Sequence, residues 1–212
     1  MRSTDSGAAA PEPLKGSTLN WRGFLVQHKR KVIYALDLQG AAIQTVQPKR
    51  PVTVRALQRG DWRLLRRDIL ARSDWRGYWW ARCHFGRRGS SIFAAEADGR
   101  LVHISWAHQG PAVLGAMPVA EGEVFIGPCY TVPEARGQGL YPYVVGCILQ
   151  EYRRRQFARA IMTVGGDNAA SIRGIEKVGF QRIGFLEYTR VVGVIKVRRR
   201  VRLAGEEDGP RS

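Results

Sequence analysis

The sequence predicts an α/β fold in which one mixed sheet is flanked by helices. Three observations support this fold class. The expected segments follow one another as strand, helices, three strands, helix, strand, helix and two final strands. Stretches of alternating polarity flank Asp98-Gly99, which is typical of a β-hairpin with a type I′ turn. A glycine-rich turn follows an apolar strand and opens a helix. No repeat with a period of roughly 20 to 50 residues indicates a solenoid or a propeller.

The composition indicates one globular domain with disordered ends. The chain has 212 residues, of which 44% are hydrophobic, and this is enough for one core. Residues 1–20 lack the apolar stretch of a secretory signal, so we expect a disordered leader and a cytoplasmic protein. We expect a hairpin extension over 21–50, the main domain over 51–203 and a disordered tail over 204–212.

The first elements are predicted from short β-prone runs. Phe24–Gln27 and Val32–Leu36 lie on either side of a basic, turn-like stretch, which predicts an amino-terminal hairpin. A strand is expected over Val52–Ala56. Apolar residues at helical spacing then run from 62 to 71, and Asp61 is the expected N-cap.

The middle of the chain changes its period from helical to alternating. Residues 73–91 are aromatic and basic, and predict an irregular or partly helical surface segment that could cover a ligand. The hairpin strands are expected over Ser91–Ala97 and Arg100–Ala107, before a Gly- and Pro-rich loop over 108–122. The remaining elements are expected as a strand over 123–132, a helix after the glycine-rich turn, a strand over 160–164, a helix over 168–178, and strands over 180–188 and 191–197.

The chain is strongly basic, with a formal net charge of +16 in which 28 arginines and 6 lysines make up the 34 basic residues. Such a field attracts polyanions, so a nucleic acid, an anionic membrane surface or a phosphorylated ligand would fit. Arginines on solvated faces without any partner would explain the charge equally well. The arginines are scattered and show no zinc-finger or RNA-recognition pattern, which makes nucleic acid an unlikely partner.

Two further classes of protein are excluded. No apolar run approaches the roughly 18 residues that a membrane span needs. Cys83, Cys129 and Cys147 are odd in number and lack CxxC or CxxH spacing, so we expect neither a disulfide framework nor a metal site. Each cysteine is expected to be a small buried hydrophobe.

The glycine-rich turn over 136–141, which reads RGQGLY, carries the first chemical signal. A turn between a strand and a helix exposes consecutive backbone N–H groups, and the helix dipole adds partial positive charge at the same place. A pyrophosphate can bind there, with Arg136 as a supplement. The alternative is that the two glycines serve the backbone conformation of a tight crossover alone.

A second motif follows the next expected strand. Asn168 and Ser171 are spaced as N-x-x-S, and residues 176–180 read EKVGF. Together with the R-x-x-G spacing of Arg136 and Gly139, these motifs resemble the acyl-CoA site of the GNAT superfamily of N-acyltransferases. The resemblance covers roughly residues 52–197. It implies a GNAT-like mixed, mostly antiparallel sheet flanked by helices, here with an extra N-terminal β-hairpin.

The resemblance also implies a donor site for acetyl-CoA as co-substrate, without a metal. The pantetheine arm would lie in a V-shaped opening between the strand that ends at Val132 and the strand over 160–164. Backbone groups near Cys129 would polarise the thioester carbonyl, and the amides of 136–141 would hold the pyrophosphate. The implied cofactor-binding residues are Cys129, Tyr130, Thr131, Val132, Arg136, Gly137, Gln138, Gly139, Leu140, Tyr141, Asn168 and Ser171.

Two positions depart from the family pattern. Tyr141 stands where the family places glycine or alanine, and its phenol either bonds a phosphate oxygen or packs. Many members have a general-acid tyrosine four residues before the glycine of Gly-Phe, where this chain has Ile175. Either Tyr130 or Tyr141 serves as the catalytic acid instead, or the thiolate leaves without help, or activity has been lost.

An acceptor ammonium with a pKa near 10 must lose a proton before it attacks. Glu123, at the start of the strand that leads to the glycine-rich turn, is the leading candidate for the catalytic base; an exposed carboxylate without a role is the alternative. His103 and His108 are the next candidates. An aromatic and basic group could line an acceptor groove or pack in the core: Trp75, Trp79, Trp80, Arg76 and Arg82.

The sequence therefore predicts an N-acetyltransferase that moves an acyl group from acetyl-CoA or a related thioester directly to a primary amine. The net charge, with Arg87 and Arg88, favours an anionic amino sugar or peptide as acceptor. A longer acyl chain from a carrier protein stays open, because the apolar loop over 111–119 could line a tunnel. A non-catalytic module that binds CoA or nucleic acid is the alternative. The N-terminal extension could form the edge of a homodimer or a wall of the substrate site.

Overall fold

The computed structural model describes residues 26–72, 75–114, 117–191 and 199–203. The predicted leader over 1–20 and the predicted tail over 204–212 lie outside these residues, as does nearly all of the strand predicted over 191–197. Residues 24–25 of the first β-prone run, 73–74 of the aromatic and basic segment and 115–116 of the predicted loop also lie outside them.

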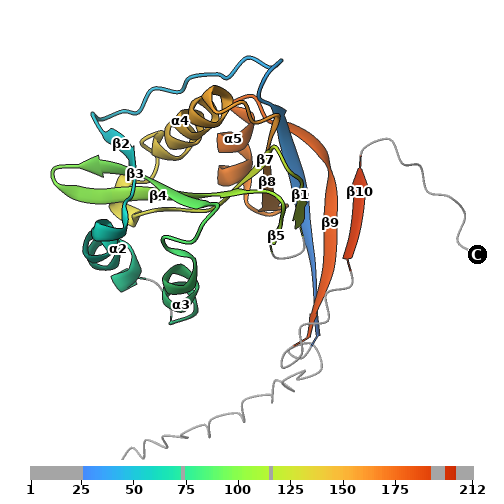
Figure 1. Ribbon diagram of the computed structural model, residues 1–212, viewed down its shortest axis with the longest axis horizontal. Coiled ribbons are helices and arrows are strands. Elements are labelled where there is room, and N and C mark those ends of the chain that lie inside the picture. Colours follow the sequence, from blue (N-terminus) through green and yellow to red (C-terminus); the bar gives the residue numbers. More distant parts are fainter. Residues whose placement is uncertain (1–25, 73–74, 115–116, 192–198, 204–212) are drawn as a thin grey trace, which may run out of the picture.

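One eight-stranded sheet forms the centre of the molecule, with the strand order β10-β9-β1-β8-β7-β4-β3-β2 (Figure 1). All neighbouring strands in it are antiparallel except β7 and β8, which are parallel. The strands are β1 Val26–Asp37, β2 Thr53–Ala56, β3 Ser90–Ala97, β4 Arg100–Gln109, β7 Glu123–Thr131, β8 Arg159–Gly165, β9 Gln181–Val191 and β10 Arg199–Leu203. The predicted mixed, mostly antiparallel sheet is confirmed.

Helices cover both faces of this sheet (Figure 1). On one face lie α4 and α5, and on the other lie α2 and α3. Their bounds are α2 Trp62–Asp68, α3 Trp75–His84, α4 Leu140–Arg154 and α5 Ala169–Glu176, with short 3-10 turns at η1 Arg59–Asp61, η2 Leu70–Arg72 and η3 Pro133–Ala135. The segment predicted as irregular or partly helical over 73–91 thus contains a helix of 10 residues.

The prediction of an amino-terminal hairpin is wrong. The described part of the first β-prone run, 26–27, and the whole second run, 32–36, belong to one continuous strand, β1, which lies between β8 and β9 in the main sheet. The basic stretch between them continues the strand because its backbone pairs with β9 and β8 and because Arg30 has partners there. Arg30 pairs with Glu187 at 3.6 Å, and its guanidinium carbon lies 3.7 Å from the centroid of the Phe185 ring.

Turn chemistry confirms one local prediction and corrects another. Asp98 and Gly99 join β3 to β4 with φ angles of 51° and 71°, as the type I′ turn requires. Asp61 occupies the N-cap position of α2, but its carboxylate does not cap the helix. The carboxylate instead accepts from Arg55 at 2.7 Å and from the Gln58 amide at 2.7 Å.

The loop predicted over 108–122 contains a small two-stranded sheet, β5 Ala112–Leu114 with β6 Met117–Val119.

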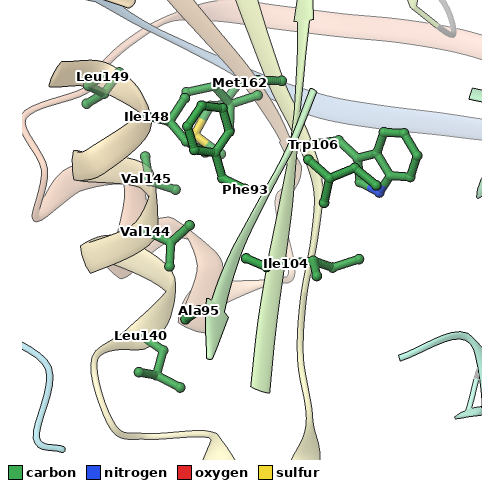
Figure 2. Packing of buried hydrophobic residues seen from close by; sticks show 14 of the residues in the cluster. Phe93, Ala95, Ile104, Trp106, Leu140, Val144, Val145, Ile148, Leu149 and Met162 are labelled. Carbon is green, nitrogen blue, oxygen red and sulfur yellow. The ribbon is translucent and has the colours of Figure 1, made fainter. Parts of the chain in front are cut away.

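The core lies mainly between α4 and the sheet, because one face of α4 is apolar along its length. Figure 2 shows Val144 and Ile148 pointing toward the strands that carry Phe93 and Ile104, while Trp106 lies on the far side of those strands. A smaller cluster on the opposite face joins Met117 of β6 to the sheet; its other buried members are Ile33, Ile161 and Leu186. Both clusters hold β7 and β8 in place from opposite sides.

Candidate functional site

The sheet opens between its two parallel strands. β7 and β8 pair only where Glu123, Val124 and Phe125 face Arg159, Ala160 and Ile161. The rest of β7 pairs with β4 alone. The described strands therefore diverge toward the carboxyl end of β7, where the chain turns into α4.

A cavity of about 590 Å³ lies at this opening. β7, the turn after it, the first turn of α4, and α5 all contribute side chains. The lining residues are His103, Cys129, Tyr130, Thr131, Ala135, Arg136, Gly137, Gly139, Leu140, Tyr141, Pro142, Asn168, Ala170, Ser171, Arg173, Gly174 and Lys177. Its volume is in the range of sites that take cofactor-sized ligands.

The glycine-rich turn has the conformation that an anion site needs. Gly137 and Gly139 have φ angles of 74° and 77°, in the left-handed region that favours glycine, and α4 begins at Leu140. The first N–H groups of a helix have no partner within it, so they are available to a negatively charged group. The Arg136 Nε donates to the Thr131 carbonyl at 3.2 Å, which ties the turn to the end of β7.

A second helix amino terminus meets the same cavity. Asn168 is the N-cap of α5, and its Oδ1 accepts the Ser171 amide at 3.1 Å. Both residues line the cavity. The amide nitrogen of the Asn168 side chain has no hydrogen-bond partner within the described residues, so it can donate to a ligand.

The cavity is positively charged. Arg136, Arg173 and Lys177 line it, and no aspartate or glutamate does. None of these three cations forms an ion pair with a carboxylate of the described residues. Three unpaired cations beside two helix amino termini suit a ligand with several negative charges.

The deep end of the cavity contains a buried polar network. His103 is fully buried; its Nδ1 lies 2.7 Å from the Thr131 hydroxyl and its Nε2 lies 2.8 Å from the Ser105 hydroxyl. Ser105 also hydrogen-bonds Cys129. Burial lowers the pKa of His103 to about 3 and raises the pKa of Cys129 to about 12. At neutral pH the network is uncharged, so it offers neither a thiolate nucleophile nor an imidazolium.

Tyr141 fills the space between β7 and α5. Its ring packs so closely on Gly174 that a Cβ there would lie 2.6 Å from a ring carbon, and its centroid is 6.0 Å from that of His103. Burial raises the pKa of Tyr141 well above its usual value of 10, so the phenol keeps its proton. Its hydroxyl has no hydrogen-bond partner among the described residues and is not enclosed, which leaves it free to donate to a ligand.

Most of the predicted donor residues meet at this cavity. Cys129, Tyr130 and Thr131 lie on its β7 side, the turn and Tyr141 lie on its α4 side, and Asn168 and Ser171 lie on α5. Two predicted residues do not line it. Val132 is buried in the core, and Gln138 donates through its side chain to the Glu134 carbonyl at 3.2 Å.

The structure does not bring Glu123 to the cavity, which removes the basis for the predicted catalytic base. Glu123 is the first residue of β7 and Cys129 the seventh, so about 20 Å of strand separates them. The buried Glu123 carboxylate is paired with Arg159, whose Nε lies 2.8 Å from it, and accepts the Ala120 amide at 2.9 Å. Its role is to hold the β6–β7 turn and β8 together.

His108, the other candidate base, lies in an aromatic cluster on the face of α3. Its Nδ1 is 2.8 Å from the Ser90 hydroxyl, and its ring stacks on Trp106. Burial, aided by the nearby His84, lowers the pKa of His108 to about 4. Trp80 joins this cluster, with its ring centroid 4.7 Å from that of Trp106, so it packs inside, whereas Trp79 is 58% exposed.

Sequence reasoning missed part of the site. Arg173 and Lys177, four residues apart on and just after α5, share the helix face that carries Ala170 toward the cavity. The four-residue spacing of these two cations was the available signal. The other lining residues not predicted are Ala135, Pro142, Ala170 and Gly174.

A second, smaller cavity of about 270 Å³ lies where the end of β2 meets the end of α3. Arg59 and Arg87 line it together with Ser90, Ser91 and Gln58, and no carboxylate does. Arg59 donates to the Gly86 carbonyl at 3.2 Å. Arg82, predicted to be near a groove, instead lies over the Trp62 ring at 5.7 Å.

Among the described residues, no helix has both the length and the apolar character needed to cross a membrane. The same part of the chain contains no group of three or more His, Cys, Asp or Glu residues placed to hold a metal ion.

Residues 54–180 match the family model described as the acetyltransferase (GNAT) family. Among curated proteins, the mycothiol acetyltransferase of Saccharomonospora viridis is 34% identical over 95 residues, which are 43% of this chain and 30% of that protein. The chain therefore matches less than a third of the length of that relative.

Solved structures share the fold. A putative acetyltransferase of the GNAT family from Novosphingobium aromaticivorans superimposes with a TM-score of 0.55 and 17% identity, covering 84% of this chain and 69% of that one. An acetyltransferase of the GNAT family from Colwellia psychrerythraea gives a TM-score of 0.51 and 15% identity, over 77% of this chain and 58% of that one. At such identities the likeness concerns the fold alone.

Proposed function

Because the chain belongs to the acetyltransferase (GNAT) family, we propose that it transfers an acetyl group from acetyl-CoA to the primary amine of a small anionic acceptor. The observation that carries the donor assignment is the 590 Å³ cavity between β7 and α5, with its glycine-rich turn and its three unpaired cations. A nucleotide diphosphate with a long polar arm suits this combination of charge and shape.

The donor is proposed to lie with its phosphates on the amides of the turn at Gly137 and Gly139. Arg136, Arg173 and Lys177 add positive charge around them. The pantetheine arm would then follow β7 toward Cys129, where β7 no longer pairs with β8. Asn168, with its free side-chain N–H, is placed to bind a carbonyl of that arm.

The reaction forms a C–N bond between the amine and the acetyl carbon and breaks the C–S bond of the thioester. The amine gives up one proton and the sulfur gains one, so a neutral amine and acetyl-CoA become an amide and free CoA. Cys129 is not proposed as a covalent intermediate, because a thiol with its pKa raised to about 12 is almost never a thiolate at neutral pH.

Tyr141 is proposed to donate a hydrogen bond to the leaving sulfur. Its ring is fixed against Gly174, its hydroxyl has no described partner, and its phenol stays protonated. Tyr130, which also lines the cavity and packs against the core, is the alternative donor. A donor held in place before the reaction stabilises the charge that develops on sulfur without having to reorient.

The acceptor is proposed to carry a negative charge. The small cavity with Arg59 and Arg87 is a place on the α2–α3 face where such a group could bind. If so, the acceptor KM should rise between about 50 and 200 mM salt, since screening weakens charge-driven binding. An Arg59→Gln, Arg87→Gln double variant should raise that KM and leave the affinity for acetyl-CoA unchanged.

The first test is calorimetric binding of acetyl-CoA at moderate salt, with ATP and a short DNA duplex as polyanion controls. Saturable binding of acetyl-CoA alone, followed by release of free CoA with an amine panel, supports the proposal. An equal response to all three ligands would indicate only a basic surface. Binding without acetyl transfer to any amine would instead favour a non-catalytic CoA-binding module.

Tyr141→Phe tests the proposed role of the phenol. We expect kcat to fall about 10- to 100-fold while the dissociation constant of CoA stays the same, because only the transition state loses a hydrogen bond. Tyr143→Phe, two residues along the same helix and outside the cavity, is the matched control. An unchanged kcat in the Tyr141 variant would remove the tyrosine from the mechanism.

A further inference from the structure

The segment between β1 and β2, residues 38–52, follows α4 along its length, and we call it the strap (Figure 1). It starts at the carboxyl end of α4, where the Arg153 side chain donates to the carbonyls of Leu38 and Ala41. It ends at the amino end of α4, where the Lys49 amide donates to the Gln138 carbonyl at 2.9 Å. The strap thus reaches the glycine-rich turn.

Both motifs of the cavity make room for the strap. A Cβ on Gly139 would lie 3.3 Å from the Gln47 carbonyl oxygen, and a Cβ on Gly179 would lie 3.1 Å from the Ala42 carbonyl oxygen. Gly139 and Gly179 also have positive φ angles, of 77° and 100°. The absent side chains at these two positions therefore accommodate backbone from the amino-terminal part of the chain, independently of any ligand.

The strap lies outside the region that matches the family. That match begins at residue 54, after the strap has ended, and includes the turn and α5. The strap is continuous with β1, which pairs with β8 and β9 in the middle of the sheet. Its position is fixed at both ends, by β1 on one side and by an ion pair of Arg50 with Asp98 at 3.3 Å on the other.

We propose that the strap is part of the donor site: it holds the glycine-rich turn in its anion-binding conformation, and Lys49 contributes a further positive charge to the donor phosphates. This inference rests on the proposed donor, acetyl-CoA. The hydrogen bond from the Lys49 amide to Gln138 places the start of the lysine side chain next to the turn. Lys49 is exposed, and no described carboxylate pairs with it, so its ammonium can turn toward a phosphate at the cavity mouth.

Two parts of the proposal have separate physical causes. The strap lies against Gly139 through Gln47 and Pro48, so it limits the conformations of the turn before ligand arrives. Ordering a loop in advance lowers the entropy that binding would otherwise lose. Lys49 acts through charge, so its effect requires phosphate on the ligand and weakens with salt.

Lys49→Gln tests the charge, with CoA, 3′-dephospho-CoA and pantetheine as calorimetric probes. We expect about tenfold weaker binding of CoA, a smaller salt dependence and unchanged binding of pantetheine, since the loss corresponds to one charge-assisted contact. Arg63→Gln, an equal charge change on exposed α2, is the control. Unchanged CoA binding in the Lys49 variant would overturn this part of the proposal.

Pro48→Gly tests the positioning role, because it loosens the strap at its contact with Gly139 and removes no charge. We expect weaker binding of CoA and of 3′-dephospho-CoA with the same salt dependence as the unmodified protein. Pro51→Gly lies in the same segment beyond Arg50 and serves as the control; it should bind both ligands normally. If the Pro48 variant binds both ligands as tightly as the unmodified protein, the strap does not position the turn.

The design separates failure of this inference from failure of the proposed function. If the unmodified protein binds no CoA, the proposed donor is wrong. If it binds CoA and neither variant changes the affinity, the donor stands and the strap has no part in the site. Thermal unfolding of each variant shows whether a loss of binding reflects loss of the fold instead.

Discussion

At the scale of single residues, the site depends on pairs of positions. In each pair a glycine leaves space that another group of the protein occupies. Tyr141 occupies its position because residue 174 has no side chain, and Gly139 has no side chain because strap backbone passes beside it. Neither relation is visible in the sequence, where each glycine appears only as part of a motif. A substitution at one member of such a pair therefore tests the other member too.

Gly174→Ala should reduce both stability and donor affinity. Its Cβ would lie 2.6 Å from the Tyr141 ring, so the ring or α5 must move, at an expected cost of about 1–3 kcal/mol in the free energy of unfolding. Gly166→Ala is the matched control, because nothing lies within 4 Å of the added methyl group. Denaturant unfolding of both variants measures the difference in their free energies of unfolding. Equal values would mean that the Tyr141 ring moves aside at no cost in stability.

Two buried histidines should make stability depend on pH. Burial lowers the pKa of His103 to about 3 and that of His108 to about 4, both below the unfolded value of 6.5. Between these values the unfolded chain binds more protons than the folded one, so the full contribution is present above about pH 6.5 and is lost as the pH falls.

We therefore expect the free energy of unfolding to fall by about 1.5 kcal/mol for His103 between about pH 6.5 and pH 5, and by less for His108, which is less deeply buried. Urea unfolding across this range gives the measurement. His108→Gln should lower the stability at neutral pH and remove its share of the pH dependence. A flat profile in the unmodified protein would mean that these imidazoles become protonated without opening the fold.

At the scale of elements, the stability of a short helix depends on the hydrogen bonds at its ends. α5 has eight residues, too few to be stable by itself, and its first turn is capped by the Asn168 side chain. The same helix carries Ser171, Arg173 and Gly174 to the cavity. Loss of the cap should thus affect the fold and the donor site together.

Asn168→Ala should lower the free energy of unfolding by about 1 kcal/mol, the typical value of an N-cap side chain. Asn168→Asp is the informative comparison, because it keeps an acceptor for the Ser171 amide but has no N–H to donate and adds a negative charge. The aspartate variant should retain stability and still bind CoA more weakly. If it binds CoA normally, the Asn168 side chain acts only as a cap.

The sequence predicts elements well where the signal is local. The Asp98-Gly99 turn, the apolar face of α4 and the helix that follows Asn168 are each specified by neighbouring residues, and all three are present. Predictions from the sequence fail where contacts with residues far away in the chain determine the local structure. β1 continues through its basic stretch because β9 supplies Glu187 and Phe185 as partners for Arg30. Glu123 lies at the expected place on its strand, but Arg159 of β8 pairs with it.

The larger cavity was predictable because two motifs in different parts of the chain describe it. The turn over 136–141 and the segment after Asn168 both carry their role in their spacing. The smaller cavity, proposed above for the acceptor, was not, since the segment after β2, the segment after α3 and the start of β3 meet there without any shared motif.

At the scale of the whole molecule, the sheet depends on its first strand. β1 pairs with β8 over Lys31–Asp37 and with β9 over Val26–Ala35. Two strands at one end of the sheet, β9 and β10, are joined to the rest of it only through β1. The donor opening, bounded by β8, therefore depends on a strand outside the region that matches the family.

A chain that begins at residue 38 should lose cooperative unfolding and bind no CoA, because β8 loses its antiparallel partner. A chain that ends at residue 198 is the control, since it loses β10, which pairs with β9 alone at the edge of the sheet. The control should melt at a lower temperature but still in a single transition. A single transition in the first truncation as well would show that β1 is dispensable.

The position of β1 also has a consequence for synthesis. During translation this strand leaves the ribosome first among the described elements, whereas its two neighbours, β8 and β9, are made only after α4. Domains fold as units, and contacts between distant parts of a chain form slowly. The nascent protein must therefore keep both edges of β1 unpaired until almost all of the chain has emerged, and in that interval a chaperone that shields exposed strand edges would protect it from aggregation.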